Sequence, residues 1–172
     1  MGLGQIGRQL YHLALEKDDI EIVAVADIGK PAIIEYLLQS DGVEEPSCKL
    51  QDNYLTNKKF RTRMFQLARP EEVPWDIMNV DCVVDATGRY RRRRDMEAHL
   101  RAGAKRVISA SLPSEPIDRI VIPGINEGHA TGADRMISAG SATTNAFALL
   151  LQFLDQSLGV DYASLTTVHA YS

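Results

Sequence analysis

Hydroxyl and small side chains gather at residues 138–145, Ser-Ala-Gly-Ser-Ala-Thr-Thr-Asn, which run directly into the apolar pattern of residues 146–154. The pattern predicts a helix N-terminus, with capping oxygens on Thr143, Thr144 and Asn145. The unpaired N–H groups of a first helical turn, with the helix dipole behind them, favour an anion or a thiolate. Such residues also begin ordinary helices, so this segment gains weight only beside other motifs.

The second segment suited to chemistry is the turn Gly2-Leu3-Gly4-Gln5-Ile6-Gly7, followed by Asp27 twenty residues after Gly7. Glycines let the backbone approach a pyrophosphate at a helix N-terminus, and an acid after the next strand accepts ribose hydroxyls. We therefore predict a cofactor site made of Gly2, Gly4, Gln5, Ile6, Gly7 and Asp27. Because a carboxylate repels a 2′-phosphate, Asp27 favours NAD over NADP. The alternative is that Asp27 has no cofactor role and is simply an acidic residue in a turn.

The elements that must position these residues alternate between helix and strand. Apolar spacing within residues 2–18 predicts a helix with Ile6, Leu10, Leu13 and Ala14 on one face. We also expect helices at 31–40, 95–102 and 145–158, strands at 20–26, 80–85, 106–110, 120–125 and 162–169, and short antiparallel strands within 52–67. The alternation predicts an α/β fold, a Rossmann-type doubly wound and mostly parallel sheet.

The glycine turn, the segment at 138–145 and the final Thr-Thr-Val-His-Ala-Tyr-Ser together resemble the phosphorylating glyceraldehyde-3-phosphate dehydrogenase family. In that family a Ser-x-x-Ser-Cys-Thr-Thr-Asn segment carries the nucleophilic cysteine, and the position of this cysteine is Ala142 here. The resemblance implies the remaining site: His169 as the base, Ser141, Thr143 and Ser172 at substrate or phosphate positions, and Thr87, Gly88 and Ser109 beside the cofactor.

The resemblance also implies two domains, an NAD(P)-binding Rossmann domain at 1–141 and the start of an α+β catalytic domain at 142–172. Since a strand normally precedes the glycine turn and the family continues well past residue 172, we expect this chain to be a fragment. The implied partners are a triose phosphate or related aldehyde as the substrate and further copies of the chain in a homotetramer. The implied role is glycolytic.

Ala142 offers neither a nucleophile nor an acid–base group, so covalent catalysis by the family's route should be absent. Ala146 also stands where the family commonly has a second cysteine, which favours natural divergence over an engineered change. Three functions stay open: an impaired dehydrogenase, an NAD-binding pseudoenzyme with a regulatory or assembly role, and an oxidoreductase with another substrate.

Five arginines surround Tyr90 in residues 89–94, and two readings of this run are open. The arginines either form a solvated helix start or hold a nucleotide phosphate, including the 2′-phosphate of NADP. A net charge of −4 argues against a general nucleic-acid binder, and no apolar run is long enough for a bilayer. We expect a cytoplasmic protein without a metal site, in which Cys82 is an inert core thiol of its strand.

Overall fold

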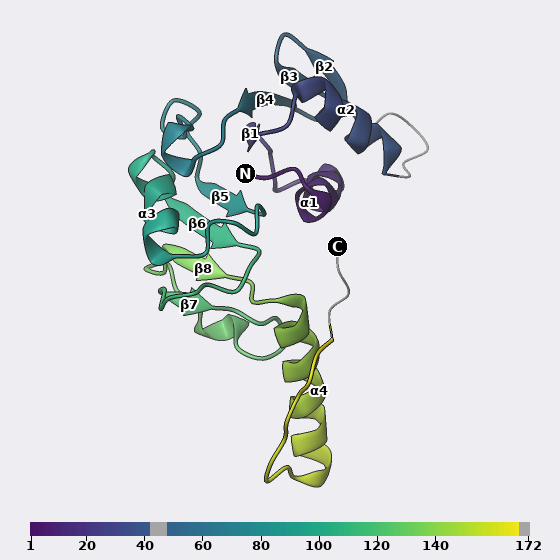
Figure 1. Cartoon of the computed structure of the whole chain (residues 1–172), viewed down its shortest axis with the longest axis vertical. Coiled ribbons are helices and arrows are strands. Elements are labelled where there is room, and N and C mark those ends of the chain that lie inside the picture. The colour runs from purple at the N-terminus through teal and green to yellow at the C-terminus, as the bar shows by residue number, and fades with distance from the viewer. Residues whose placement is uncertain (42–47, 169–172) are drawn as a thin grey trace.

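The computed structural model describes residues 1–41 and 48–168, whose strands form two four-stranded sheets (Figure 1). The first sheet has the order β1-β4-β3-β2, with β1 parallel to β4 and the other pairs antiparallel. Its strands are β1 (Ala24–Asp27), β2 (Lys49–Gln51), β3 (Tyr54–Thr56) and β4 (Arg61–Gln66). The second sheet, β5-β6-β8-β7, is parallel throughout and consists of β5 (Cys82–Asp85), β6 (Arg106–Ser109), β7 (Arg119–Ile120) and β8 (Met136–Ser138).

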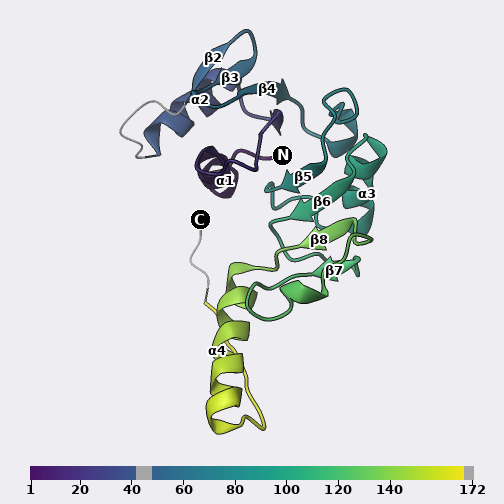
Figure 2. The same ribbon diagram turned by 180° about the vertical axis from the view of Figure 1, so that it is seen from behind.

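Residues Met1 and Gly2 connect the facing edges of the two sheets. The Gly2 N–H donates to the carbonyl of Ala26 at 2.8 Å, and the Ala86 N–H donates to the carbonyl of Met1 at 2.8 Å. Both views show the N-terminus lying between β1 and β5 (Figures 1 and 2). The glycine turn therefore begins at the junction of the sheets, beside the carboxyl ends of β1 and β5.

Helices lie on both sides of the two sheets, as in a doubly wound fold, although they do not cover every strand on both sides. Helix α1 (Gln5–Leu15) lies on one side and α3 (Arg93–Arg101) on the other, while α2 (Pro31–Ser40) covers the first sheet (Figures 1 and 2). Beneath α1 and α2, a core cluster contains Tyr11, Ile34, Leu38, Leu55 and Met64. The predicted Rossmann-type fold and the helix at 31–40 are confirmed, as are the short antiparallel strands within 52–67.

The predicted apolar face of α1 is wrong in part. Ala14 is buried, but Ile6, Leu10 and Leu13 are 51%, 39% and 53% exposed, and the inward face is formed by Gly7, Tyr11 and Ala14. The backbone of the glycine turn sets this rotation, because only a residue without a side chain fits where Gly7 meets it. Hydropathy predicts that the face with Ile6, Leu10 and Leu13 is buried, because it has more apolar carbon. The close contact between Gly7 and the Gly2 carbonyl instead turns the face with Tyr11 inward.

Strand β5 is shorter than predicted and is buried on alternate residues only. Val83 and Asp85 point inward, whereas Cys82 is exposed and Val84 is 37% exposed, so Cys82 is not the core thiol that we expected. The apolar residues 82–84 suggest burial on both faces, but successive side chains of a strand point to opposite sides, and the side that carries Cys82 and Val84 is exposed here. Of the predicted strand at 120–125, only Ile120 lies in a strand, as the second residue of β7.

The last described helix, α4 (Ala142–Leu158), projects from the second sheet, and residues 159–168 run back along it (Figures 1 and 2). It begins three residues before the predicted start at 145. The predicted strand does not form over residues 162–168, and Val168 is 94% exposed. A segment without a neighbouring strand has no partner for its backbone hydrogen bonds, so residue type alone does not make it a strand.

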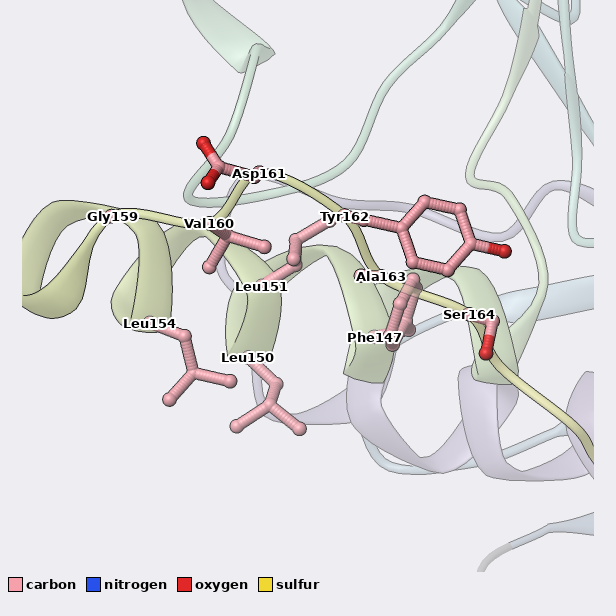
Figure 3. A pocket seen from close by; sticks show the side chains of 10 residues that line it. All are labelled: Phe147, Leu150, Leu151, Leu154, Gly159, Val160, Asp161, Tyr162, Ala163 and Ser164. Carbon is pink, nitrogen blue, oxygen red and sulfur yellow. The ribbon is translucent and has the colours of Figure 1, made fainter.

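Between α4 and the returning segment lies an open cleft of about 520 Å³, lined by Phe147, Leu150, Leu151, Leu154 and residues 159–164 (Figure 3). Its lining is mostly apolar and holds no group suited to chemistry apart from the Asp161 carboxylate and the hydroxyls of Tyr162 and Ser164. No helix among the described residues is both long and apolar enough to cross a membrane.

Candidate cofactor site

The glycine turn folds back on itself at the start of α1. Gly2 has φ +84°, and a Cβ on Gly7 would lie 1.8 Å from the Gly2 carbonyl oxygen, so neither position accepts a side chain without rearrangement. Gly4 is the N-cap of α1, and a Cβ there would meet no protein atom within 4 Å. The turn thus presents open space in front of a helix N-terminus, a geometry that suits a pyrophosphate.

Asp27 ties the glycine turn to the end of β1. One carboxylate oxygen accepts the Leu3 N–H at 2.6 Å, and the other accepts the Gly29 N–H at 2.7 Å. The structure therefore brings Asp27 and the glycine turn together, as their spacing predicted. A carboxylate has about four lone-pair sites, so these two bonds leave acceptors for ribose hydroxyls.

Thr87 and Gly88 form the facing wall of the site at the carboxyl end of β5. A Cβ on Gly2 would lie 2.8 Å from the Thr87 nitrogen and 2.9 Å from its Cγ2, so the two segments are in direct contact. Gly88 has φ +67° and turns the chain away after Thr87. The structure therefore unites Gly2, Asp27, Thr87 and Gly88 at one sheet edge, where open α/β folds bind their ligands.

The turn at Thr87 rests on a buried polar network that sequence reasoning missed. One oxygen of Asp85 accepts both the Thr87 N–H at 2.8 Å and the Thr87 hydroxyl at 2.6 Å, and the other lies 3.3 Å from His99 Nε2. The Trp75 indole N–H donates to His99 Nδ1 at 3.1 Å. Burial raises the pKa of the Asp85 carboxyl, but the donors on His99 and Thr87 outweigh it and lower the pKa below its ordinary value.

Ser109 ends β6 beside Ser138 of β8, and its hydroxyl is used within its own loop. It donates to the carbonyl of Ser111 at 3.1 Å and accepts the Ser111 N–H at 3.2 Å, while the side chain is 3% exposed. Ser138 donates to the same carbonyl at 2.8 Å and accepts the Gly140 N–H at 3.0 Å. Ser138, which the sequence did not single out, therefore fixes the chain just before α4; a cofactor contact of Ser109 stays a prediction.

The N-terminus of α4 has a different cap from the one that we expected. Ser141 is the N-cap, and its hydroxyl accepts the Thr144 N–H at 3.0 Å and lies 2.8 Å from the Thr144 hydroxyl. The Asn145 amide bonds instead to the carbonyls of Ala139 and Ser141 at 2.8 and 2.9 Å. Ala142, exposed, and Thr143, half-buried, are the first two residues of the helix. The substrate-binding roles of Ser141 and Thr143 stay predictions.

Four other predicted site residues stand apart from this geometry. Gln5 and Ile6 lie in the exposed first turn of α1, where cofactor contact stays a prediction. His169 and Ser172 lie outside the described residues, so their predicted positions near α4 are not tested.

The arginine run leads into α3 and its five arginines are exposed, in agreement with the solvated helix start. Arg93 pairs with Glu97 at 3.1 Å and with Asp118 at 3.4 Å. A second open cleft of about 520 Å³ is lined by Arg69, Arg89, Tyr90, Arg91, Arg92, Asp95 and Ser114. The alternative of a nucleotide phosphate stays a prediction.

The fold and the residues at its carboxyl edge define a dinucleotide-binding domain of the Rossmann class. Residues 1–93 match the family described as glyceraldehyde 3-phosphate dehydrogenase, NAD binding domain. The chain belongs to this family, and NAD is its cofactor. The open space at Gly4 and the acceptors of Asp27 fit that cofactor.

Curated relatives match along nearly the whole chain. Glyceraldehyde-3-phosphate dehydrogenase of Haloarcula vallismortis is 36% identical over 177 residues, which cover 99% of this chain and 52% of the relative. The enzymes of the same name from Mycoplasma pneumoniae and Thermotoga maritima are each 34% identical, with 99% of this chain and 52% and 53% of the relatives covered. The chain therefore spans about half the length of the relatives that it matches.

Proposed function

We propose that this chain is the NAD-binding domain, at 1–141, and the start of the catalytic domain, at 142–172, of a glyceraldehyde-3-phosphate dehydrogenase-like oxidoreductase that lacks the family's thiol chemistry. The observation that carries the proposal is Ala142 at the first position of α4, directly after the Ser141 cap. A helix N-terminus stabilises a thiolate, but a methyl side chain can form no thiohemiacetal with an aldehyde. The name of these relatives supports a triose phosphate or related aldehyde as the ancestral substrate and glycolysis as the ancestral role.

The chain's own residues are assigned as follows. The α1 N-terminus at Gly4, Gln5 and Ile6 binds the pyrophosphate, Asp27 accepts the ribose hydroxyls, and Thr87 and Gly88 bound the nucleotide. NAD supplies a hydride acceptor when bound. His169 is proposed as the base, with Ser141, Thr143 and Ser172 toward the substrate and phosphate.

Ser141 does not replace the missing sulfur. Its hydroxyl is engaged with the N–H and hydroxyl of Thr144, and no base lies within hydrogen-bond distance of it among the described residues. An unactivated hydroxyl is a weak nucleophile at neutral pH. We therefore expect no NADH formation from glyceraldehyde 3-phosphate, NAD and phosphate above background.

The test restores sulfur at one position and compares it with a second position on the same helix. We expect the thiol introduced by Ala142→Cys to alkylate with a pKa below that of a free cysteine, because the α4 N-terminus favours its thiolate. Ala146→Cys, also exposed but one turn further into α4, should give a thiol of ordinary pKa. Adding His169→Asn to Ala142→Cys should raise the alkylation pKa again if His169 is the base.

The alkylation pKa and NADH formation together separate the candidate functions. If the thiol of Ala142→Cys has a low pKa and the variant forms NADH, the protein is an impaired dehydrogenase. If the thiol has a low pKa but the variant shows no turnover, the result supports an NAD-binding pseudoenzyme with a regulatory or assembly role. A low-pKa thiol in a variant that reduces NAD with another aldehyde indicates an oxidoreductase with a different substrate. Equal pKa values for the two introduced thiols would show that Ala142 does not occupy the position of the family's nucleophile. A homotetramer in the cytoplasm is part of the proposal, tested by light scattering and by cell fractionation.

A further inference from the structure

The network behind the cofactor wall consists of Trp75, His99, Asp85 and Thr87. Trp75, His99 and Asp85 are 2%, 0% and 3% exposed, so this polar chain runs through the interior between α3 and the end of β5. It ends at Thr87, which contacts Gly2 of the glycine turn. We infer that His99 is a positioning residue for the cofactor, which acts through Asp85 on the Thr87–Gly88 turn.

The donors and acceptors fix the direction of the chain. An indole N–H can only donate, so the bond from Trp75 requires His99 Nδ1 to carry a lone pair. In that tautomer the ring hydrogen is on Nε2, which donates to the Asp85 carboxylate at 3.3 Å. Trp75 thereby selects the only neutral form of His99 that can hold Asp85.

Asp85 needs this donor because it is a buried acid. Among residues 1–41 and 48–168, His99 is the only basic side chain within 4 Å of its carboxylate. The other carboxylate oxygen holds the N–H and the hydroxyl of Thr87, which together fix the backbone and the side-chain rotamer of that residue. The Thr87 oxygen in turn accepts the Arg89 N–H at 3.2 Å and so shapes the turn around Gly88.

Loss of the His99 donor therefore frees Asp85 to turn, and Thr87 loses its fixed position against Gly2. This inference rests on the proposed placement of NAD at Thr87 and Gly88. It adds that a side chain on the far side of β5, without contact to the nucleotide, sets the affinity for NAD.

The test is a double-mutant cycle on NAD affinity, measured by calorimetry with the full chain. We expect His99→Asn, too short to reach Asp85, and Thr87→Val each to weaken NAD binding by about five- to tenfold. The double variant should bind no more weakly than the weaker single variant, because both changes break the same chain. His99→Gln, whose amide can donate to Asp85, should restore most of the affinity.

Controls separate positioning from loss of stability. Met96→Ala removes a buried side chain from the same helix but leaves the network intact, so it should lower the urea midpoint without changing NAD affinity. Trp75 is the only tryptophan, so its emission reports whether the core is folded wherever that residue is retained. If His99→Asn does not fold, Trp75→Phe replaces it in the cycle, with an expected loss of about two- to threefold.

If His99→Asn, or Trp75→Phe where it replaces that variant, binds NAD as tightly as the parent chain does, the inference is overturned. If the double variant loses NAD affinity by the product of the two single losses, the residues act independently, and the inference is also overturned. A parent chain that binds no NAD would overturn the proposed cofactor site and this inference together. A parent that binds NAD while the His99 and Trp75 variants match it would overturn only the role of His99.

Discussion

At the scale of single residues, we expect Asp27 to set the preference of the site for NAD over NADP. Its carboxylate already accepts two backbone N–H groups, from Leu3 and Gly29, so it is held at the turn. We expect the chain to bind NAD more tightly than NADP. Asp27→Asn, which keeps one oxygen acceptor, should reduce the ratio of NAD affinity to NADP affinity by about tenfold or more. Calorimetric titration with both cofactors measures this. Tighter binding of NADP by the parent would show that Asp27 does not face the ribose.

Gly4 and Gly7 make a matched pair of residues in one turn. A Cβ at Gly7 would lie 1.8 Å from the Gly2 oxygen, so Gly7→Ala should lower the free energy of unfolding by about 2 kcal/mol or more. A Cβ at Gly4 meets no protein atom within 4 Å, so Gly4→Ala should change stability by less than about 1 kcal/mol. Gly4→Ala should nevertheless weaken NAD binding, because its methyl group enters the space assigned to the pyrophosphate.

Urea denaturation and NAD titration of both glycine variants separate stability from binding. Full NAD affinity in Gly4→Ala would place the pyrophosphate elsewhere. An unchanged urea midpoint in Gly7→Ala would mean that α1 shifts freely against the turn.

At the scale of elements, α4 depends on one capping side chain. The Ser141 hydroxyl accepts the Thr144 N–H at 3.0 Å, so Ser141→Ala should lower stability by about 1 kcal/mol. Thr143→Ala, inside the first turn, is the control and should change stability by less than about 0.5 kcal/mol. Circular dichroism during thermal unfolding follows the loss. A larger effect at Thr143 than at Ser141 would contradict the observed cap.

At the scale of the whole molecule, α4 and the segment after it leave apolar side chains in water. No residue of α4 is buried, and Phe153, Leu158 and Tyr162 are 66%, 80% and 85% exposed. Such a surface favours association, so we expect the isolated chain to bind a hydrophobic dye and to self-associate with rising concentration. Phe153→Ser should reduce both signals, whereas the control Tyr36→Ser, at an exposed site of α2, should not. A monomer that binds no dye at high concentration would contradict this expectation.

Local signals in the sequence determined much of the nucleotide site. The site needs glycines for a tight backbone turn and an acid at a set distance from them, and both requirements are visible in residue type and spacing. Gly2, Gly7 and Asp27 were therefore predicted together, and they lie together in the structure. The alternation of helix and strand likewise determined the fold class, because hydrophobic period and element length are local.

Tertiary structure decided which faces are buried and which distant polar groups meet. The inward face of α1 is chosen by a backbone contact at Gly7, against the hydropathy of Ile6 and Leu13, because steric exclusion outweighs a small gain in apolar burial. The meeting of Trp75, His99 and Asp85 joins a loop, a helix and a strand, and a single sequence carries no signal for that contact. The strand predicted at 162–169 did not form over 162–168, because a strand exists only when another backbone accepts its hydrogen bonds.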